Sequence, residues 1–176
     1  VKIAKLKSSE FVEMPEVVRL DNLFGTERLM PCNIAAMTES NRSYIEALAD
    51  TAIERVRHYY EEYKDKADIV WCSFSGGKDS MVLLDIVQRA LPHDAFKVFF
   101  TNTHMEYPDT YQYIDTIRKW CAERQIDFIV CESDKVPEET WREFGPPATR
   151  IRWCCSVHKT APQMLKAREI AGKPDI

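Results

Sequence analysis

The sequence predicts an α/β protein, in which a doubly wound parallel β-sheet carries helices on both faces. From residue 69 onward, short apolar runs rich in β-forming residues alternate with segments of helical periodicity, in the order strand, helix, strand, helix, strand. The first of these runs is apolar at consecutive positions, which is typical of a parallel strand buried on both faces. Right-handed crossovers between such strands produce a parallel sheet.

The predicted elements begin with an amphipathic helix that starts near residues 38–40, where Ile45, Ala49 and Ile53 follow a helical period. Strands are predicted over 69–74, 96–100 and 126–131, and further helices over 79–91, from Pro108 onward, over 138–144 and over 153–171. Pro108 suits the first position of a helix, because the N–H that it lacks has no partner there anyway. The helix over 79–91 is apolar nearly all round, which predicts that it is buried.

The first 37 residues show no sustained period, and Pro15 and Pro31 interrupt them, so we expect an irregular arm or the end of a preceding region. Residues 38–176 are assigned to one domain of ordinary size. Its three predicted strands are fewer than the five or six usual for a sheet, so we expect the domain to be truncated at its C-terminal end.

The composition is globular, with 45% hydrophobic and 30% charged residues. The net charge of −4 argues against a protein that coats nucleic acid, although it leaves room for a local basic site. The sequence shows neither a signal peptide nor an apolar run of the roughly 18 residues that a membrane span needs. We therefore expect a cytoplasmic protein with no membrane partner and with its six cysteines reduced.

The most informative motif is SGGKDS, which follows a predicted strand and opens a predicted helix. Its glycines let the backbone turn tightly and approach a ligand, and the free N–H groups and dipole of the helix attract an anion. A lysine adds positive charge, and two serine hydroxyls add hydrogen-bond donors. We predict a phosphate-binding loop that consists of Ser75, Gly76, Gly77, Lys78, Asp79 and Ser80.

Two better-known loops do not fit this motif. A Walker A loop requires Ser or Thr after its lysine, whereas Asp79 follows Lys78 here, and the GxGxxG pattern of dinucleotide-binding folds is absent. An ordinary turn between strand and helix remains as the alternative. Asp79, and Asp109 in a later helix, are also explained as acidic residues that favour a helix N-terminus.

The motif resembles the SGGxDS pyrophosphate loop of the N-type ATP pyrophosphatase superfamily, whose fold is adenine nucleotide alpha hydrolase-like. Within that superfamily, the sequence is similar to the phosphoadenosine phosphosulfate (PAPS) reductase family. Residues 102–110 resemble that family's loop after the second strand, and residues 150–159 resemble its later arginine, cysteine and lysine segment. The resemblance covers roughly residues 65–165. It implies an adenylyl nucleotide ligand, namely PAPS, adenosine 5′-phosphosulfate (APS) or ATP, with Mg²⁺ if ATP is used.

Other candidate binding residues lie beyond the loop. Ligands of open parallel sheets sit at the carboxyl ends of the strands, where Asn102 and Thr103 follow the second strand. Residues 145–159 contain Arg150, Arg152 and Lys159 and no acidic residue, and a guanidinium matches the oxygens of phosphate or sulfate. We predict that these three cations bind the distal anion. For the two arginines, the alternative is a solvated surface pair.

Two histidines and three cysteines are expected to contribute to the structure rather than to bind a ligand. His104 and His158 are interpreted as making ordinary surface contacts. Cys72, Cys121 and Cys131 lie in predicted strands or on an inner helix face, so they are interpreted as small core residues. Cys32 is not placed by the pattern.

The adjacent pair Cys154 and Cys155 is treated separately. Some sulfonucleotide reductases carry such a pair together with a later CxxC, and the four thiolates hold a [4Fe–4S] cluster. The CxxC is absent from this sequence, so a cluster would need ligands beyond this chain. Zinc bound by the pair and His158 would lack a fourth ligand.

The resemblance implies a sulfonucleotide reductase of sulfur assimilation, in which a thiolate attacks the sulfur of bound phosphosulfate and a thioredoxin or glutaredoxin releases sulfite. The sequence does not identify that nucleophilic cysteine. One alternative is an ATP pyrophosphatase-type enzyme that adenylates its substrate, as in FAD synthesis or nucleic-acid thiolation. Another is a non-catalytic nucleotide-binding module of a longer protein.

Overall fold

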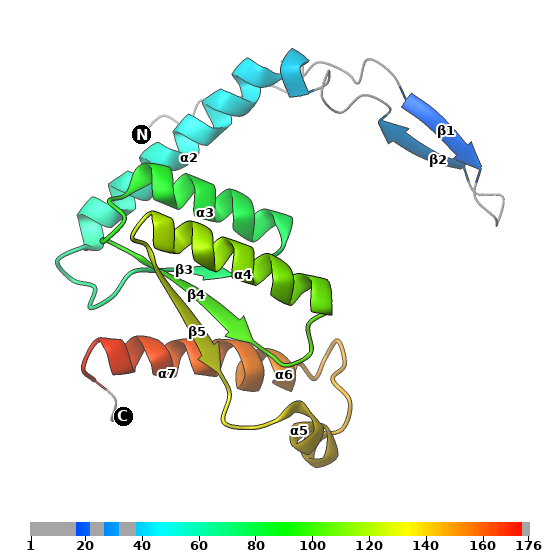
Figure 1. Ribbon diagram of the computed structural model, residues 1–176, viewed down its shortest axis with the longest axis vertical. Helices are drawn as coiled ribbons and strands as arrows, with labels where there is room; N and C mark the ends of the chain where they lie inside the picture. The colour runs from blue at the N-terminus through cyan, green and yellow to red at the C-terminus, as the bar shows by residue number, and fades with distance from the viewer. Residues whose placement is uncertain (1–16, 22–26, 32–37, 174–176) are drawn as a thin grey trace. The chain divides into compact units, whose positions relative to one another are not determined.

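The computed structural model describes residues 17–21, 27–31 and 38–173 (Figure 1). The chain divides into two compact units, Val1–Glu54 and Arg55–Ile176, and the division falls within helix α2 (Arg42–Tyr63). Each unit is described by itself. None of the helices in the described ranges is long and apolar enough to cross a membrane.

The first unit contains two short strands, β1 (Val17–Asp21) and β2 (Glu27–Pro31), which pair in antiparallel fashion. These two segments are regular in structure and lie within the residues for which we expected an irregular arm or the end of a preceding region. Each strand has only five residues and does not alternate strictly between polar and apolar side chains, so the sequence carries no periodic signal for it. The rest of the predicted arm, including Cys32, lies outside the described residues.

The second unit is built on a parallel sheet of β3 (Trp71–Phe74), β4 (Lys97–Asn102) and β5 (Asp127–Glu132). The strands lie side by side in the order β3, β4, β5, so β4 is flanked on both sides. The three predicted strands are thereby confirmed. Only the central strand β4 is buried on both faces, whereas β3 and β5 each contain exposed positions, because they form the edges of this sheet.

Helices cover both faces of this sheet, which confirms the predicted α/β class. Helices α3 (Lys78–Ala90) and α4 (Pro108–Glu123) lie on one face, and α7 (Ala161–Ile170) lies on the other (Figure 1). The remaining elements are α5 (Pro137–Phe144), the single turn α6 (Trp153–Cys155) and a π-helix, η2 (Ser156–Thr160). Pro108 begins α4, as predicted.

The core on the α7 side centres on Phe99 of β4, which is fully buried. Its ring stacks on that of Trp71 with centroids 5.4 Å apart, and it packs with Cys131 of β5 and Ala167 of α7. Because successive strand residues point to opposite faces, Phe100 faces the α3 and α4 side instead. This packing fixes α7 against the sheet, and α7 carries part of the functional site.

Two predictions about burial have different outcomes. Cys72, Cys121 and Cys131 are buried, as predicted, and burial raises the pKa of each thiol to about 11. The prediction that the helix over 79–91 is buried all round is wrong. Val82 and Leu83 of α3 are exposed, because only the stripe of a helix that faces the sheet is covered by it.

Candidate functional site

The predicted phosphate-binding loop lies at the carboxyl end of β3, where the chain turns into α3. Gly76 has a φ of +78°, in the left-handed region that favours glycine. A Cβ atom at this position would lie 3.3 Å from the Ile114 side chain and 3.5 Å from that of Thr110. The loop therefore packs closely on α4, and a larger residue at Gly76 would strain both the backbone and this contact.

The start of α3 offers its N–H groups to a ligand. Gly77 is the N-cap residue and makes no side-chain capping hydrogen bond. Ser80 holds the loop closed, since its Oγ donates to the Gly77 carbonyl at 2.8 Å and accepts from the Ser75 amide at 3.3 Å. The Ser75 hydroxyl also donates to Ser80 Oγ at 3.3 Å. Ser80 thus holds the loop in shape, while Ser75 lines the adjacent pocket.

Lys78 and Asp79 form an ion pair at the surface, with 88% and 89% of their side chains exposed. Exposed pairs of this kind contribute little to stability, so the Lys78 ammonium can exchange its partner for a bound anion at small cost. Neither side chain lines the pocket described next. Asp79 lies in the first turn of α3, as expected for a helix-stabilising acid.

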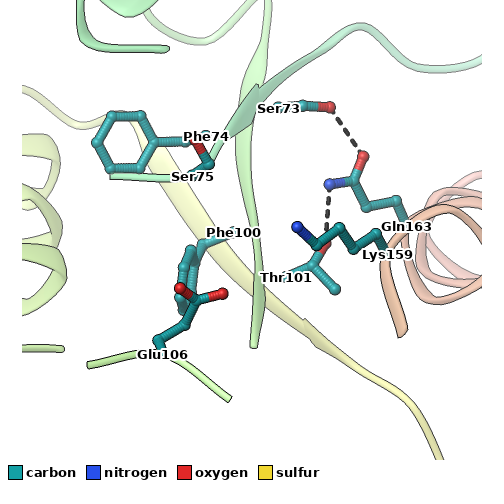
Figure 2. Close-up of a pocket in the computed structure, with 8 residues that line it drawn as sticks. All are labelled: Ser73, Phe74, Ser75, Phe100, Thr101, Glu106, Lys159 and Gln163. Atoms are coloured by element: carbon teal, nitrogen blue, oxygen red, sulfur yellow. Dashed lines mark hydrogen bonds between the residues drawn. The ribbon is translucent and has the colours of Figure 1, made fainter. Parts of the chain in front are cut away.

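A pocket of about 240 Å³ opens beside the loop, at the carboxyl ends of β3 and β4 (Figure 2). Two predicted site residues, Ser75 and Lys159, meet in it although they are far apart in the sequence. Figure 2 shows Glu106 and Lys159 on opposite sides of the pocket. The residues that line it are Ser73, Phe74, Ser75, Phe100, Thr101, Glu106, Lys159 and Gln163.

Gln163 of α7 joins two strands inside this pocket. The Ser73 hydroxyl of β3 donates to its Oε1 at 2.8 Å, and its Nε2 donates to Thr101 Oγ1 of β4, also at 2.8 Å. The sequence places Thr101 at the carboxyl end of the second predicted strand and Glu106 in the loop after it, but it does not single out either side chain for the pocket. It gives no signal for Gln163, because the meeting of Gln163 with Thr101 depends on how α7 packs against the sheet.

Asn102 and Thr103, predicted to contact the nucleotide, organise the loop after β4. Thr103 is 2% exposed, and its hydroxyl donates to Glu106 Oε1 at 3.1 Å. The Asn102 amide donates to Glu132 at 2.7 Å and accepts from the Tyr111 hydroxyl at 3.0 Å. Thr103 therefore aligns the pocket carboxylate, while a contact of either residue with the nucleotide stays a prediction.

The basic segment, residues 145–159, places its three cations in two different environments. Lys159 lines the pocket from η2. Arg150 and Arg152 are exposed and lie outside the pocket lining, next to a tight turn in which Ala148 and Ile151 exchange backbone hydrogen bonds. Among the described residues, neither guanidinium has a hydrogen-bond or ion-pair partner. Their role in binding the distal anion stays a prediction.

His158 is fully buried, so the prediction of a surface contact is wrong for this residue. Its Nε2 lies 2.9 Å from Thr140 Oγ1 of α5, and its ring meets the Trp153 ring edge-on at 6.0 Å between centroids. Burial lowers the pKa of the imidazole. The burial depends on tertiary packing, because the π-helix η2 that carries His158 packs against Thr140 of α5.

Comparison with known proteins identifies the domain. The phosphoadenosine phosphosulfate reductase domain matches residues 69–172, which include the loop, every residue of the pocket lining and the basic segment. The chain belongs to this family.

The PAPS reductase domain also has relatives among individual proteins. An uncharacterized protein of Methanocaldococcus jannaschii is 29% identical over 151 residues, which is 86% of this chain and 35% of that protein. A second one from the same organism is 30% identical over 126 residues, 72% of this chain and 25% of its own length. An adenosine 5′-phosphosulfate reductase of Bacillus anthracis is 32% identical over 109 residues, 58% of this chain and 43% of that enzyme. The chain thus spans less than half of each relative.

In this PAPS reductase domain, Cys154 and Cys155 are half-buried neighbours in α6. Two thiolates are too few for a [4Fe–4S] cluster, and the described residues contain no group of three or more side chains placed to hold a metal ion. Zinc bound by the pair and His158 would need these three side chains to be placed together, and no such group is found among the described residues. The described residues therefore do not fit either metal centre.

Proposed function

We propose that this domain binds an adenylyl nucleotide, with its pyrophosphate or phosphosulfate group at Ser75–Ser80, and works as part of a sulfonucleotide reductase. One observation carries the proposal: the pocket at the carboxyl ends of β3 and β4 joins the loop to Lys159. The match to the PAPS reductase domain and the similarity to an APS reductase support the same ligand class. The nucleotide, the reaction and the partners are all part of the proposal.

The loop and the pocket beside it together offer groups that suit a nucleotide anion. The N–H groups of the first turn of α3 attract negative charge, and Lys78 and Lys159 add two cations from different elements. Phe74 and Phe100 give the pocket an apolar wall, and Gln163 supplies a fixed amide. A few polar groups on an apolar wall are typical of sites that orient a small ligand.

In the proposed reaction, a thiolate attacks the sulfur of the bound phosphosulfate. The bond between that sulfur and the bridging oxygen breaks, and the nucleotide leaves with the electron pair of the bond. The resulting S-sulfo cysteine is then attacked by a thiol of thioredoxin or glutaredoxin, which releases sulfite and forms a disulfide. None of the described residues that line the pocket is a cysteine, so the nucleophile is not assigned to them.

Isothermal titration calorimetry with PAPS, APS and ATP tests the binding step. We expect Lys78→Ala and Lys159→Ala each to weaken binding by about tenfold, because a hydrogen bond to a charged group contributes about 1.5–3 kcal/mol. Lys64→Ala is the matched control, since Lys64 directly follows α2 and pairs at the surface with Glu61 of that helix. Undiminished affinity in both the loop variant Lys78→Ala and the pocket variant Lys159→Ala would contradict the proposal.

Glu106 favours a second candidate, an enzyme of the ATP pyrophosphatase type. Mg²⁺ is usually held by one or two carboxylates together with the phosphates of its nucleotide, and the Glu106 carboxylate lines the pocket. Such an enzyme would adenylate a substrate and release pyrophosphate, as in FAD synthesis or nucleic-acid thiolation.

Binding of ATP with and without Mg²⁺ separates the two candidates. If the second candidate holds, Mg²⁺ strengthens ATP binding to the wild-type chain and no longer does so in Glu106→Gln. Release of pyrophosphate from ATP in the presence of an acceptor would then identify an adenylating enzyme. Tight nucleotide binding without any turnover would indicate a non-catalytic module of a longer protein.

A further inference from the structure

His158 and Thr140 form a polar pair inside the apolar packing between two helical segments. Both residues have no exposed surface, and a contact of 2.9 Å joins His158 Nε2 to Thr140 Oγ1. Thr140 belongs to α5 and His158 to η2, so the pair links two elements that are separated by the loop with Arg150 and Arg152. Buried polar groups of this kind are retained only when they are hydrogen-bonded.

The hydrogen bonds determine which ring nitrogen of His158 carries the proton. The Thr140 hydroxyl has one hydrogen, which it donates to the Pro137 carbonyl at 2.9 Å. Thr140 Oγ1 must therefore accept from His158, so Nε2 carries the proton and Nδ1 has a lone pair. Nδ1 is buried and has no hydrogen-bond partner among the described residues. A second proton there would create an unpaired buried charge, so the ring is neutral.

The next residue along the chain, Lys159, faces the pocket. Both residues lie in η2, where a π-helical turn replaces regular α-helical geometry; such turns are frequent at functional sites. Neighbouring residues of a helix have Cα–Cβ bonds in different but fixed directions, so anchoring His158 also fixes the direction in which the Lys159 side chain leaves the backbone. Trp153 supports this corner, since its ring contacts His158 and its Nε1 donates to the Gly145 carbonyl at 3.1 Å.

We propose that His158 is a positioning residue, which anchors η2 to α5 through Thr140 and thereby directs Lys159 into the pocket. This role rests on the proposed function of the pocket, in which Lys159 meets the anion. Lys159 has no partner among the described residues, so nothing at its own ammonium holds its direction. The rigid element that carries it must do so, and the His158 hydrogen bond fixes that element from the opposite side.

A double-mutant cycle with pyrophosphate as the probe tests this role by calorimetry. His158→Phe fills the ring volume but removes the hydrogen bond, and we expect it to weaken pyrophosphate binding about tenfold when Lys159 is present. In the Lys159→Ala background, the same change should alter binding by less than about twofold. His158→Gln keeps an N–H donor for Thr140 and should restore most of the affinity. Equal losses in both backgrounds would overturn the proposal.

A second readout needs no ligand and so separates this proposal from the proposed function. The rate at which acetic anhydride modifies Lys159, measured by peptide mass spectrometry against Lys173, should change in His158→Phe and return in His158→Gln. An unchanged rate would overturn the positioning role, whereas wild-type chain that does not bind pyrophosphate would overturn only the proposed function. If His158→Phe does not fold, Thr140→Val removes the acceptor instead.

His93→Phe is the matched control for both readouts. The Nδ1 atom of His93 lies 2.9 Å from the Arg124 carbonyl, so it also makes a partly buried histidine contact with the backbone. It lies between α3 and β4, outside the pocket lining. A purely structural role for His158 would make the two histidine variants behave alike, with lower stability and unchanged Lys159 reactivity.

Discussion

Gln163 of α7 donates a hydrogen bond of 2.8 Å to Thr101 Oγ1 at the end of β4, inside the pocket. Thr101 is buried, and among the described residues Gln163 is the one side chain that forms a hydrogen bond with its hydroxyl. The same Gln163 amide accepts from Ser73 of β3 at 2.8 Å. A single side chain from the opposite layer therefore holds both strand ends that form the pocket.

Substituting Gln163 should affect stability and binding in different ways. Gln163→Ala leaves Thr101 without this partner, and we expect the free energy of unfolding to fall by about 1–3 kcal/mol. Gln163→Glu places a negative charge in the pocket and should also weaken pyrophosphate binding, because like charges repel. Urea unfolding followed by tryptophan fluorescence, together with calorimetry, measures both effects. A Gln163→Glu variant that binds pyrophosphate as tightly as the wild type would show that the anion does not reach this pocket.

Gly76→Ala should destabilise the chain more than a matched glycine change. An alanine with φ near +78° costs about 1–2 kcal/mol in the backbone, and here its Cβ also presses on Ile114. Gly172 is the control, since it has a φ of +69° but no neighbour within 4 Å of its would-be Cβ. Urea unfolding should therefore rank Gly76→Ala below Gly172→Ala in stability, and only Gly76→Ala should weaken pyrophosphate binding. Equal losses would mean that the contact with α4 is unimportant.

The thiols should react in two distinct groups. Burial raises the pKa of Cys72, Cys121 and Cys131 to about 11, so at pH 8 only about one in a thousand of each is a thiolate. Cys154 and Cys155 are only half-buried. We expect iodoacetamide to modify the adjacent pair first and the three core thiols only after unfolding, as followed by peptide mass spectrometry. Early modification of Cys121 in folded chain would contradict the packing of α4.

The buried imidazole of His158 should make stability depend on pH. Burial, with a smaller effect from the charge of His104, lowers the folded pKa of the imidazole below its ordinary value of 6.5. The unfolded chain therefore binds a proton at a higher pH than the folded chain does. The contribution of His158 to stability is complete above about pH 6.5 and is lost as the pH falls from there through the folded pKa.

Urea unfolding at several values between pH 8 and pH 5 measures this dependence. We expect the wild-type chain to lose more stability over that range than His158→Gln, which has no proton to gain at this position. His93→Gln provides the comparison for an ordinary histidine, whose contact lies elsewhere in the domain. Parallel pH profiles for wild type and His158→Gln would show that the ring is not held neutral by its surroundings.

Much of the fold could be predicted from the sequence, because its signals are local. Apolar runs and helical periods placed β3, β4 and β5 and the helices between them, and Pro108 marked the first residue of α4. The glycines of SGGKDS required a sharp turn after β3, which the positive φ of Gly76 confirms. The pairing of β1 with β2 escaped prediction, since five-residue strands without alternation carry no periodic signal.

Tertiary structure decided which side chains line the pocket together with Ser75. Lys159 and Gln163 meet Ser75 because η2 and α7 pack against the sheet, and such a contact leaves no trace in local periodicity. The burial of His158 likewise depends on a π-helical turn and on a partner in α5. The sequence by itself determined the layered fold and the position of the SGGKDS loop, since both follow from neighbours along the chain. Which side chains face that loop was decided by packing between elements that are distant in sequence.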